Sequence, residues 1–182
     1  MTTGLKDRLK DFPADAITRT AVIRGENEEY RYLLSRVWDP YELTCVWIML
    51  NPSTADGTVD DATIRKCMRF AWLWGHGGIL VTNLFAWRSR HPKELLRPDI
   101  DPVGPENDRY LVQATKGASR VVCGWGALPF ATDRAVTIPR LLLHSGWLPQ
   151  CLGRTQSGAP KHPLMLAYAT ELEVMRHDPR SH

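Results

Sequence analysis

The clearest pattern along the chain is an unbroken apolar run from Cys45 to Leu50 that stops at Asn51-Pro52. A run this short, rich in Val, Ile and Trp, predicts a strand that is buried on both faces. Proline has no backbone donor, so the ladder cannot continue past Pro52. Similar runs over residues 79–84 and 118–123 predict two more buried strands, and residues 147–152 a shorter fourth one.

Amphipathic helices are predicted between these strands. After Asp60 or Asp61, either of which could cap a helix, the apolar residues follow the three–four spacing of one helical face, namely Ile64, Cys67, Met68, Ala71 and Trp72. Further helices are predicted over residues 106–116, 130–143 and 164–176. Alternating strands and helices with short turns predict a three-layer α/β/α fold around a mostly parallel sheet.

The first part of the chain has a different pattern. Residues 1–16 are polar and predict a short helix or a loose arm. Alternation over residues 17–23, a Gly-containing turn, and renewed alternation at Tyr30, Tyr32, Leu34 and Arg36 predict an N-terminal β-hairpin. With 182 residues, we expect one α/β domain over residues 1–182.

Composition narrows the function only slightly. The net charge of +3 does not demand a nucleic-acid partner. Arginine outnumbers lysine, which suits bidentate phosphate contacts, although a GC-rich genome would give the same bias. The four cysteines are widely spaced, so we expect no metal and no cofactor. No signal core and no apolar run of ~20 residues is present, so we expect a cytoplasmic protein outside the membrane.

Candidate chemistry lies where strands end. Asn51 and Asn83 follow or close buried strands, and His162 lies on the loop after the fourth. The carboxyl ends of strands are where open α/β sheets bind ligands. Each residue also has a purely structural interpretation, because asparagine and histidine commonly cap turns and helix starts.

Several motifs resemble a bacterial and phage domain family of unknown function. They are Leu50-Asn51-Pro52-Ser53-Thr54-Ala55-Asp56, Asp60-Asp61-x-Thr63-x-Arg65, Asn83-Leu84-Phe85-Ala86 and Gly104-Pro105-Glu106-Asn107-Asp108. More distantly, three motifs and their order resemble the uracil-DNA glycosylase superfamily: Asn51-Pro52, the segment from Val81 to Arg88, and Lys161-His162-Pro163.

The glycosylase resemblance implies a role for each central residue. Asn51 would hold the attacking water, and His162 would donate a hydrogen bond to the departing base. Asn83 would read the base edge, because its amide offers one donor group and one acceptor. Asp56 could supply the carboxylate base that an amide cannot provide.

Supporting roles follow from the same resemblance. Phe70 or Trp72 would stack on an extruded base. The remaining expected substrate-binding residues are Pro52, Ser53, Thr54 and Arg88. Contacts with nucleic acid are expected from Arg154 and Lys161, and Leu164 would act as a wedge in the duplex, unless it belongs to the buried face of a last helix.

We therefore expect a DNA glycosylase-like hydrolase that acts on a deaminated or modified base, with nucleic acid or a nucleotide as its partner. Two departures keep alternatives open: Leu50 stands where glycosylases have a small residue, and Leu164 stands where they have a serine. The alternatives are a non-catalytic nucleic-acid or nucleotide-binding protein of the same fold, and an enzyme acting on free nucleosides or nucleotides.

A serine hydrolase is not expected, because Ser53 lacks the Gly-x-Ser-x-Gly elbow that positions the nucleophile in such enzymes. The sequence leaves the oligomeric state open.

Overall fold

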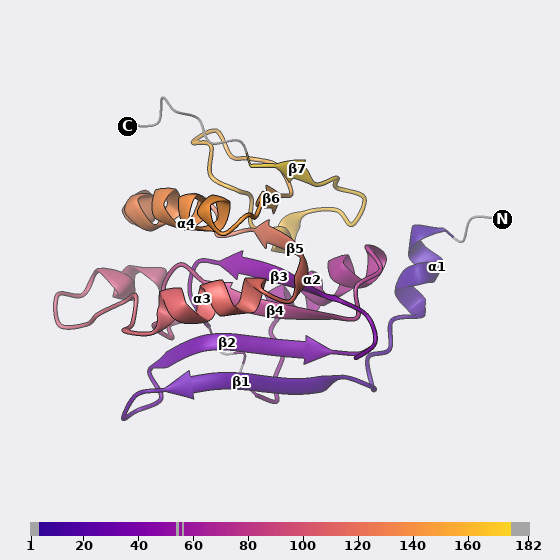
Figure 1. Cartoon of the computed structure of the whole chain (residues 1–182), viewed down its shortest axis with the longest axis horizontal. Helices are drawn as coiled ribbons and strands as arrows, with labels where there is room; N and C mark the ends of the chain where they lie inside the picture. The colour runs from indigo at the N-terminus through magenta and orange to yellow at the C-terminus, as the bar shows by residue number, and fades with distance from the viewer. Residues whose placement is uncertain (1–3, 54, 56, 176–182) are drawn as a thin grey trace.

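The computed structural model describes residues 4–53, 55 and 57–175. These residues form a seven-stranded sheet in the order β1-β2-β4-β3-β5-β6-β7 (Figure 1). The strands are β1 (Thr18–Arg24), β2 (Tyr30–Val37), β3 (Thr44–Met49), β4 (Gly78–Asn83), β5 (Ala118–Cys123), β6 (Gln150–Cys151) and β7 (Glu173–Val174). The α-helices are α1 (Leu5–Lys10), α2 (Ala62–Leu73), α3 (Asn107–Thr115) and α4 (Thr132–His144). Single turns of 3-10 helix are η1 (Pro92–Leu96), η2 (Pro129–Ala131) and η3 (Pro163–Met165).

The sheet is mixed, with a parallel centre and antiparallel edges. The four central strands β4, β3, β5 and β6 run parallel to one another. The pairs β1–β2, β2–β4 and β6–β7 are antiparallel. The prediction of a mostly parallel sheet is correct only for the centre, because strand direction depends on how connections cross the sheet and not on the apolar pattern within a strand.

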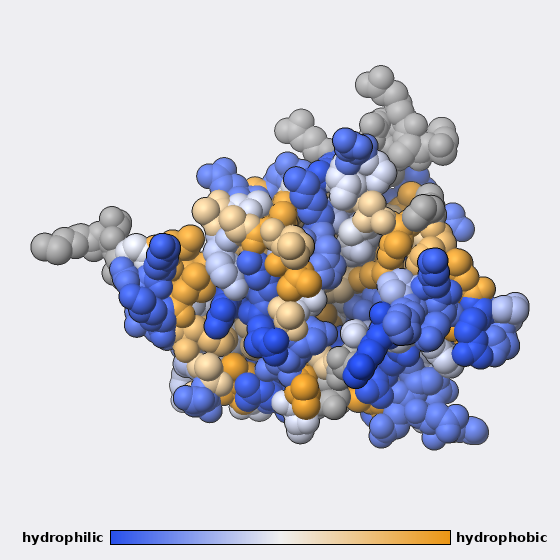
Figure 2. All heavy atoms as spheres, turned by 180° about the vertical axis from the view of Figure 1, so that it is seen from behind, coloured by the Kyte–Doolittle hydropathy of each residue, from blue (hydrophilic) through white to orange (hydrophobic). Residues whose placement is uncertain are grey.

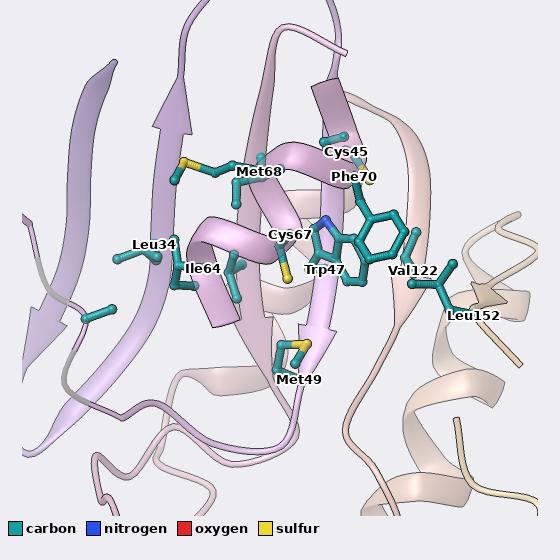
Figure 3. Packing of buried hydrophobic residues seen from close by; sticks show 14 of the residues in the cluster. Leu34, Cys45, Trp47, Met49, Ile64, Cys67, Met68, Phe70, Val122 and Leu152 are labelled. Atoms are coloured by element: carbon teal, nitrogen blue, oxygen red, sulfur yellow. The ribbon is translucent and has the colours of Figure 1, made fainter. Parts of the chain in front are cut away.

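Strand β3 supplies both cores of the molecule. Cys45, Trp47 and Met49 face α2 (Figure 3), whereas Val46 and Ile48 belong to the core on the other face, with side chains from α3 and α4. All six residues of β3 except its first are buried. The helices therefore cover both faces of the sheet, as expected for an α/β fold.

The predicted helix over residues 164–176 is wrong in its described part. After η3 the chain continues without a helix into β7. Leu166, Tyr168 and Leu172 pack against the core on the α2 side. The Tyr168 ring lies 5.1 Å from the ring of Phe70, and Lys66 Nζ lies 3.8 Å from the centre of the Tyr168 ring. These tertiary contacts outweigh the local helical pattern.

The pairing of β1 with β2 contains an irregularity. Val22 pairs with Leu33, but the next residue, Ile23, pairs with Arg31. Tyr32 is therefore the extra residue on β2, which is the arrangement of a β-bulge. The simple alternation in the sequence does not predict this shift, because an alternating pattern contains no signal for one inserted residue.

The surface mixes polar and apolar side chains. On the face opposite to that of Figure 1, they are interspersed (Figure 2). In the part of the chain that the structure describes, no helix combines the length and apolar character that crossing a membrane requires.

A buried ion pair connects the loop before α2 to the sheet. Asp60 accepts hydrogen bonds from Arg36 Nε at 2.5 Å and from Arg19 Nε at 3.2 Å. The Arg36 side chain is completely buried. We expect Asp60→Asn to lower the free energy of unfolding by about 3–5 kcal/mol, because it leaves a buried charge without its counter-ion. Urea denaturation measures this loss.

The matched control is Asp99→Asn, which removes a carboxylate from an exposed pair with Arg97. Its effect on the denaturation midpoint is expected to be small. Equal effects of the two substitutions would contradict the structural role of Asp60.

Candidate functional site

One pocket lies beyond the carboxyl ends of β3 and β4, next to the first turn of α2. Its volume is about 280 Å³. Met49 and Ile64, which line it, lie at the tip of β3 and at the start of α2 (Figure 3). Six lining residues carry polar groups that matter for its chemistry: Arg31, Asn51, Asp61, Asn83, Trp125 and His162. The structure thus brings together three residues that the sequence placed at or after strand ends.

Asn51 is held in one orientation. Its Nδ2 donates to the backbone oxygen of Pro52 at 3.1 Å and to that of Ser89 at 2.9 Å. Two carbonyl acceptors identify this atom as the nitrogen, because a carboxamide oxygen could not donate to them. The Oδ1 atom is therefore the one left to accept a hydrogen bond.

Asn83 closes β4 and is only 1% exposed. Neither its Oδ1 nor its Nδ2 has a hydrogen-bond partner among the described residues. A buried polar group without a partner costs about 1–3 kcal/mol, so such groups are uncommon and require an explanation. In this pocket, a bound ligand with an adjacent donor and acceptor would satisfy both atoms.

The end of β4 is held from the opposite face. Asn107 Nδ2 donates to the backbone oxygens of Asn83 and Leu84, both at 3.0 Å. Arg134 Nε donates to the Leu84 oxygen at 3.0 Å, and its guanidinium also pairs with Asp108. Two residues of the Gly104–Asp108 motif therefore fix the backbone that carries Asn83.

His162 lines the pocket from the loop that precedes η3. Its Nδ1 accepts a hydrogen bond from the Leu164 backbone N–H at 3.3 Å. In the neutral ring the proton is therefore on Nε2. The residue as a whole is exposed, but loss of water around the ring lowers the pKa of His162, and the carboxylate of Asp61 offsets this only partly. The neutral ring is thus favoured.

The sequence did not identify Arg31 and Trp125 as site residues, and it assigned Asp61 only to helix capping. Arg31 is 3% exposed, and its Nη1 donates to the Ala55 oxygen. Trp125 is also 3% exposed, and its indole Nε1 has no partner among the described residues. Asp61 Oδ1 caps α2 through the Ile64 N–H at 2.8 Å. The Gly-Trp-Gly turn after β5 could have indicated Trp125. Arg31 could not be found in this way, because its place in the pocket depends on the bulge in β2, for which the sequence contains no signal.

Phe70 and Trp72 do not line this pocket. Phe70 is fully buried, with its ring centre 5.3 Å from that of Trp74. Trp72 packs against the N-terminal segment, and its Nε1 donates to the backbone oxygen of Arg8. Neither ring can stack on a base in the pocket, because the helical face that carries them is directed to the core and to α1.

The other expected residues are more scattered. Ser53 lines the pocket and also a neighbouring hollow of about 460 Å³, to which Arg88 belongs. Pro52 is buried beside Asn51. On the loop of His162, Lys161 and Leu164 are exposed and Arg154 forms an ion pair with Glu173. Thr54 and Asp56 lie outside the described residues.

Metal ligands do not gather at this site. Over residues 4–53, 55 and 57–175, no group of three His, Cys, Asp or Glu side chains is arranged to hold a metal ion. The four cysteines are buried free thiols, and burial raises the pKa of Cys45, Cys67 and Cys123.

Two asparagines with the same exposure provide a direct test of the site. Because Asn83 has no partner in the described structure, we expect Asn83→Leu to keep or raise the free energy of unfolding, by up to about 1 kcal/mol. Asn107 is equally buried but donates twice, so Asn107→Leu should lower it by about 2 kcal/mol. Denaturation midpoints distinguish the two, and a similar loss for both would show that Asn83 is a structural residue.

Comparisons with known proteins place the chain in a family. The family model described as "Protein of unknown function (DUF1643)" matches residues 31–164. Searches of curated proteins and of solved structures found no match. The matched range contains β3, β4, α2 and every polar pocket residue discussed above. The chain therefore belongs to the DUF1643 family.

Proposed function

We propose that the protein is a DNA glycosylase-like hydrolase that cleaves the N-glycosidic bond of a deaminated or modified base. The observation that carries this proposal is that Asn51, Asn83 and His162, from three separate segments, line one pocket of about 280 Å³. This volume is close to the lower end of the usual range for ligand pockets. Their order along the chain is also the order of the motifs that resemble the uracil-DNA glycosylase superfamily.

The attacking water would be held by Asn51. Its Nδ2 is occupied by two carbonyls, so Oδ1 is available to accept a hydrogen bond from water. An amide is too weak a base to remove a proton early in the reaction. This property suits a transition state in which the base departs before water attacks. Asp61 is a carboxylate on the same pocket wall and could accept the proton later.

The departing base would be bound by Asn83 and His162. The two unpartnered polar atoms of Asn83 can pair with an acceptor and a donor on one base edge. The neutral His162 ring presents its Nε2–H, which can stabilise negative charge as it develops on the base. Leu164 and Met165, 38% and 89% exposed, follow His162-Pro163 and would enter the gap that an extruded base leaves in the duplex.

A second candidate is a nucleic-acid or nucleotide-binding protein that does not cut. Leu50 favours it, because this side chain lines the pocket at the position where glycosylases have a small residue. An enzyme acting on free nucleosides or nucleotides is compatible with the same pocket, since the walls described here do not require a polymer.

Base release tests the first candidate. The assay uses single- and double-stranded oligonucleotides that contain uracil, hypoxanthine or other modified bases. We expect the wild type to release a free base and Asn51→Ala to do so about 10²-fold more slowly, because the water is no longer positioned. Gln156→Ala, at an exposed loop residue, is the control. Absence of release across the panel would overturn the hydrolase, and binding without an abasic product would favour the second candidate.

The pH profile tests the role of His162. Because the pKa of His162 is lowered, the ring should stay neutral as the pH falls to about 6.5, which is the ordinary pKa of histidine. At lower pH, protonation of Nδ1 would abolish the acceptor for the Leu164 N–H. We therefore expect the rate of base release to be constant from neutral pH to about 6.5 and to fall only below it. A fall that begins above that value would contradict a lowered pKa.

A further inference from the structure

We propose that DNA lies along the solvent-exposed face of α2 when one of its bases enters the pocket, and that Arg65 and Arg69 contact its backbone phosphates. The inference rests on the proposed function, because it takes nucleic acid as the partner of the pocket. It adds an interaction surface to that site, since the residues expected to contact nucleic acid, Arg154, Lys161 and Leu164, all lie outside α2.

The pocket and this helix begin at the same place. The first turn of α2 contributes Thr63 and Ile64 to the pocket lining, beside Met49 at the tip of β3. Phe70 lies further along the helix (Figure 3). A DNA strand that leaves the pocket on this side would therefore pass along α2.

The charged residues of α2 all have the same sign. The helix contains Arg65, Lys66 and Arg69 but no acidic residue. Arg65 and Arg69 are exposed, and Lys66 is half-buried. The other three α-helices of the described structure each combine acidic and basic residues. Protein surfaces usually intersperse the two signs, so α2 is distinguished from the other helices by its charge.

Carboxylates do not neutralise this helix face in the described part of the chain. None of the ion pairs there includes Arg65, Lys66 or Arg69. Arg65 donates to the backbone oxygen of Asp60, and Lys66 Nζ lies over the ring of Tyr168. Burial lowers the pKa of Lys66, and the charge of Arg69 lowers it further. Like charges one turn apart destabilise a helix, and a bound phosphate would relieve that repulsion.

The spacing of the two exposed arginines suits a DNA strand. Arg65 and Arg69 are four residues apart, so they lie on the same side of the helix with a rise of about 6 Å between them. Successive phosphates of one strand follow at about 3.4 Å along the axis of a duplex. The two guanidinium groups can therefore reach phosphates about two nucleotides apart, each in the bidentate geometry that arginine forms with phosphate.

The segment beside α2 extends the same surface. The 3-10 turn η3 packs against α2 and presents Leu164 and Met165 to solvent. Lys161, which is also exposed, precedes it, and His162 between them lines the pocket. The pocket is thus accompanied by basic groups suited to phosphates and by two apolar side chains suited to unstacked bases.

Binding of unmodified DNA tests the inference without any base release. The probes are a fluorescein-labelled duplex of about 20 base pairs and one of its single strands, measured by anisotropy over a range of salt concentrations. We expect the wild type to bind at least one of them, about tenfold or more weakly at 200 mM than at 50 mM salt, because two or three phosphate contacts release counter-ions.

Two substitutions locate the surface. Arg69→Gln should fold normally, because the side chain is exposed and forms no ion pair in the described structure. It should weaken binding and reduce the slope of log affinity against log salt by about one. The matched control, Lys116→Gln, removes an exposed charge at the end of α3, on the other face of the sheet, and should leave the slope unchanged.

The wild-type measurement alone can overturn the inference. Binding of neither DNA, or binding that salt does not weaken, would do so, as would an unchanged slope in folded Arg69→Gln. Binding to phosphatidylserine vesicles but not to DNA would assign the surface to a membrane and would also overturn it. Salt-dependent binding through α2 without base release would reject the hydrolase but keep the inference. Base release with an unchanged slope in Arg69→Gln would do the reverse.

Discussion

The structure depends on the complete burial of β3. Its side chains alternate between two cores, so both faces must be covered, and its backbone pairs with β4 on one side and β5 on the other. At Pro52 the ladder cannot continue. The neighbouring strands are still tied to the end of β3, because Leu84 N donates to the Met49 oxygen and Gly124 N to the Ile48 oxygen. Asn51, Asn83 and Trp125 are therefore brought around one opening.

This arrangement explains how polar groups are kept unpaired beside a dense core. Asn51 uses its nitrogen to fix its own loop and leaves its oxygen for the pocket. Asn83 leaves both atoms free of partners in the described structure, while Asn107 and Arg134 hold the backbone beneath it. A carboxamide kept in this way lowers stability but needs no reorganisation when a ligand arrives, which is the advantage of a preorganised site.

The irregular part of the sheet has a comparable role. With regular alternation along β2, Arg31 would lie on the same face of the sheet as Leu33, which is the α3 side, and would point away from α2. The bulge reverses this, at the cost of one unpaired residue. Departures from regular geometry in otherwise regular proteins are expected to concentrate near functional sites, and here the departure delivers a buried cation to the pocket.

The sequence by itself determined the buried strands, the helix after Asn51 and the polar residues at the strand ends, because local hydrophobic periodicity and proline chemistry act within a few residues. Tertiary structure decided the strand directions, the extended path of residues 166–172, the core position of Phe70 and the packing of Trp72 against the N-terminal segment. Those outcomes depend on contacts between distant segments, such as Tyr168 on Phe70. Arg31 shows this most clearly. One extra residue in β2 decides on which face of the sheet its side chain lies, and no local pattern in the sequence indicates that insertion.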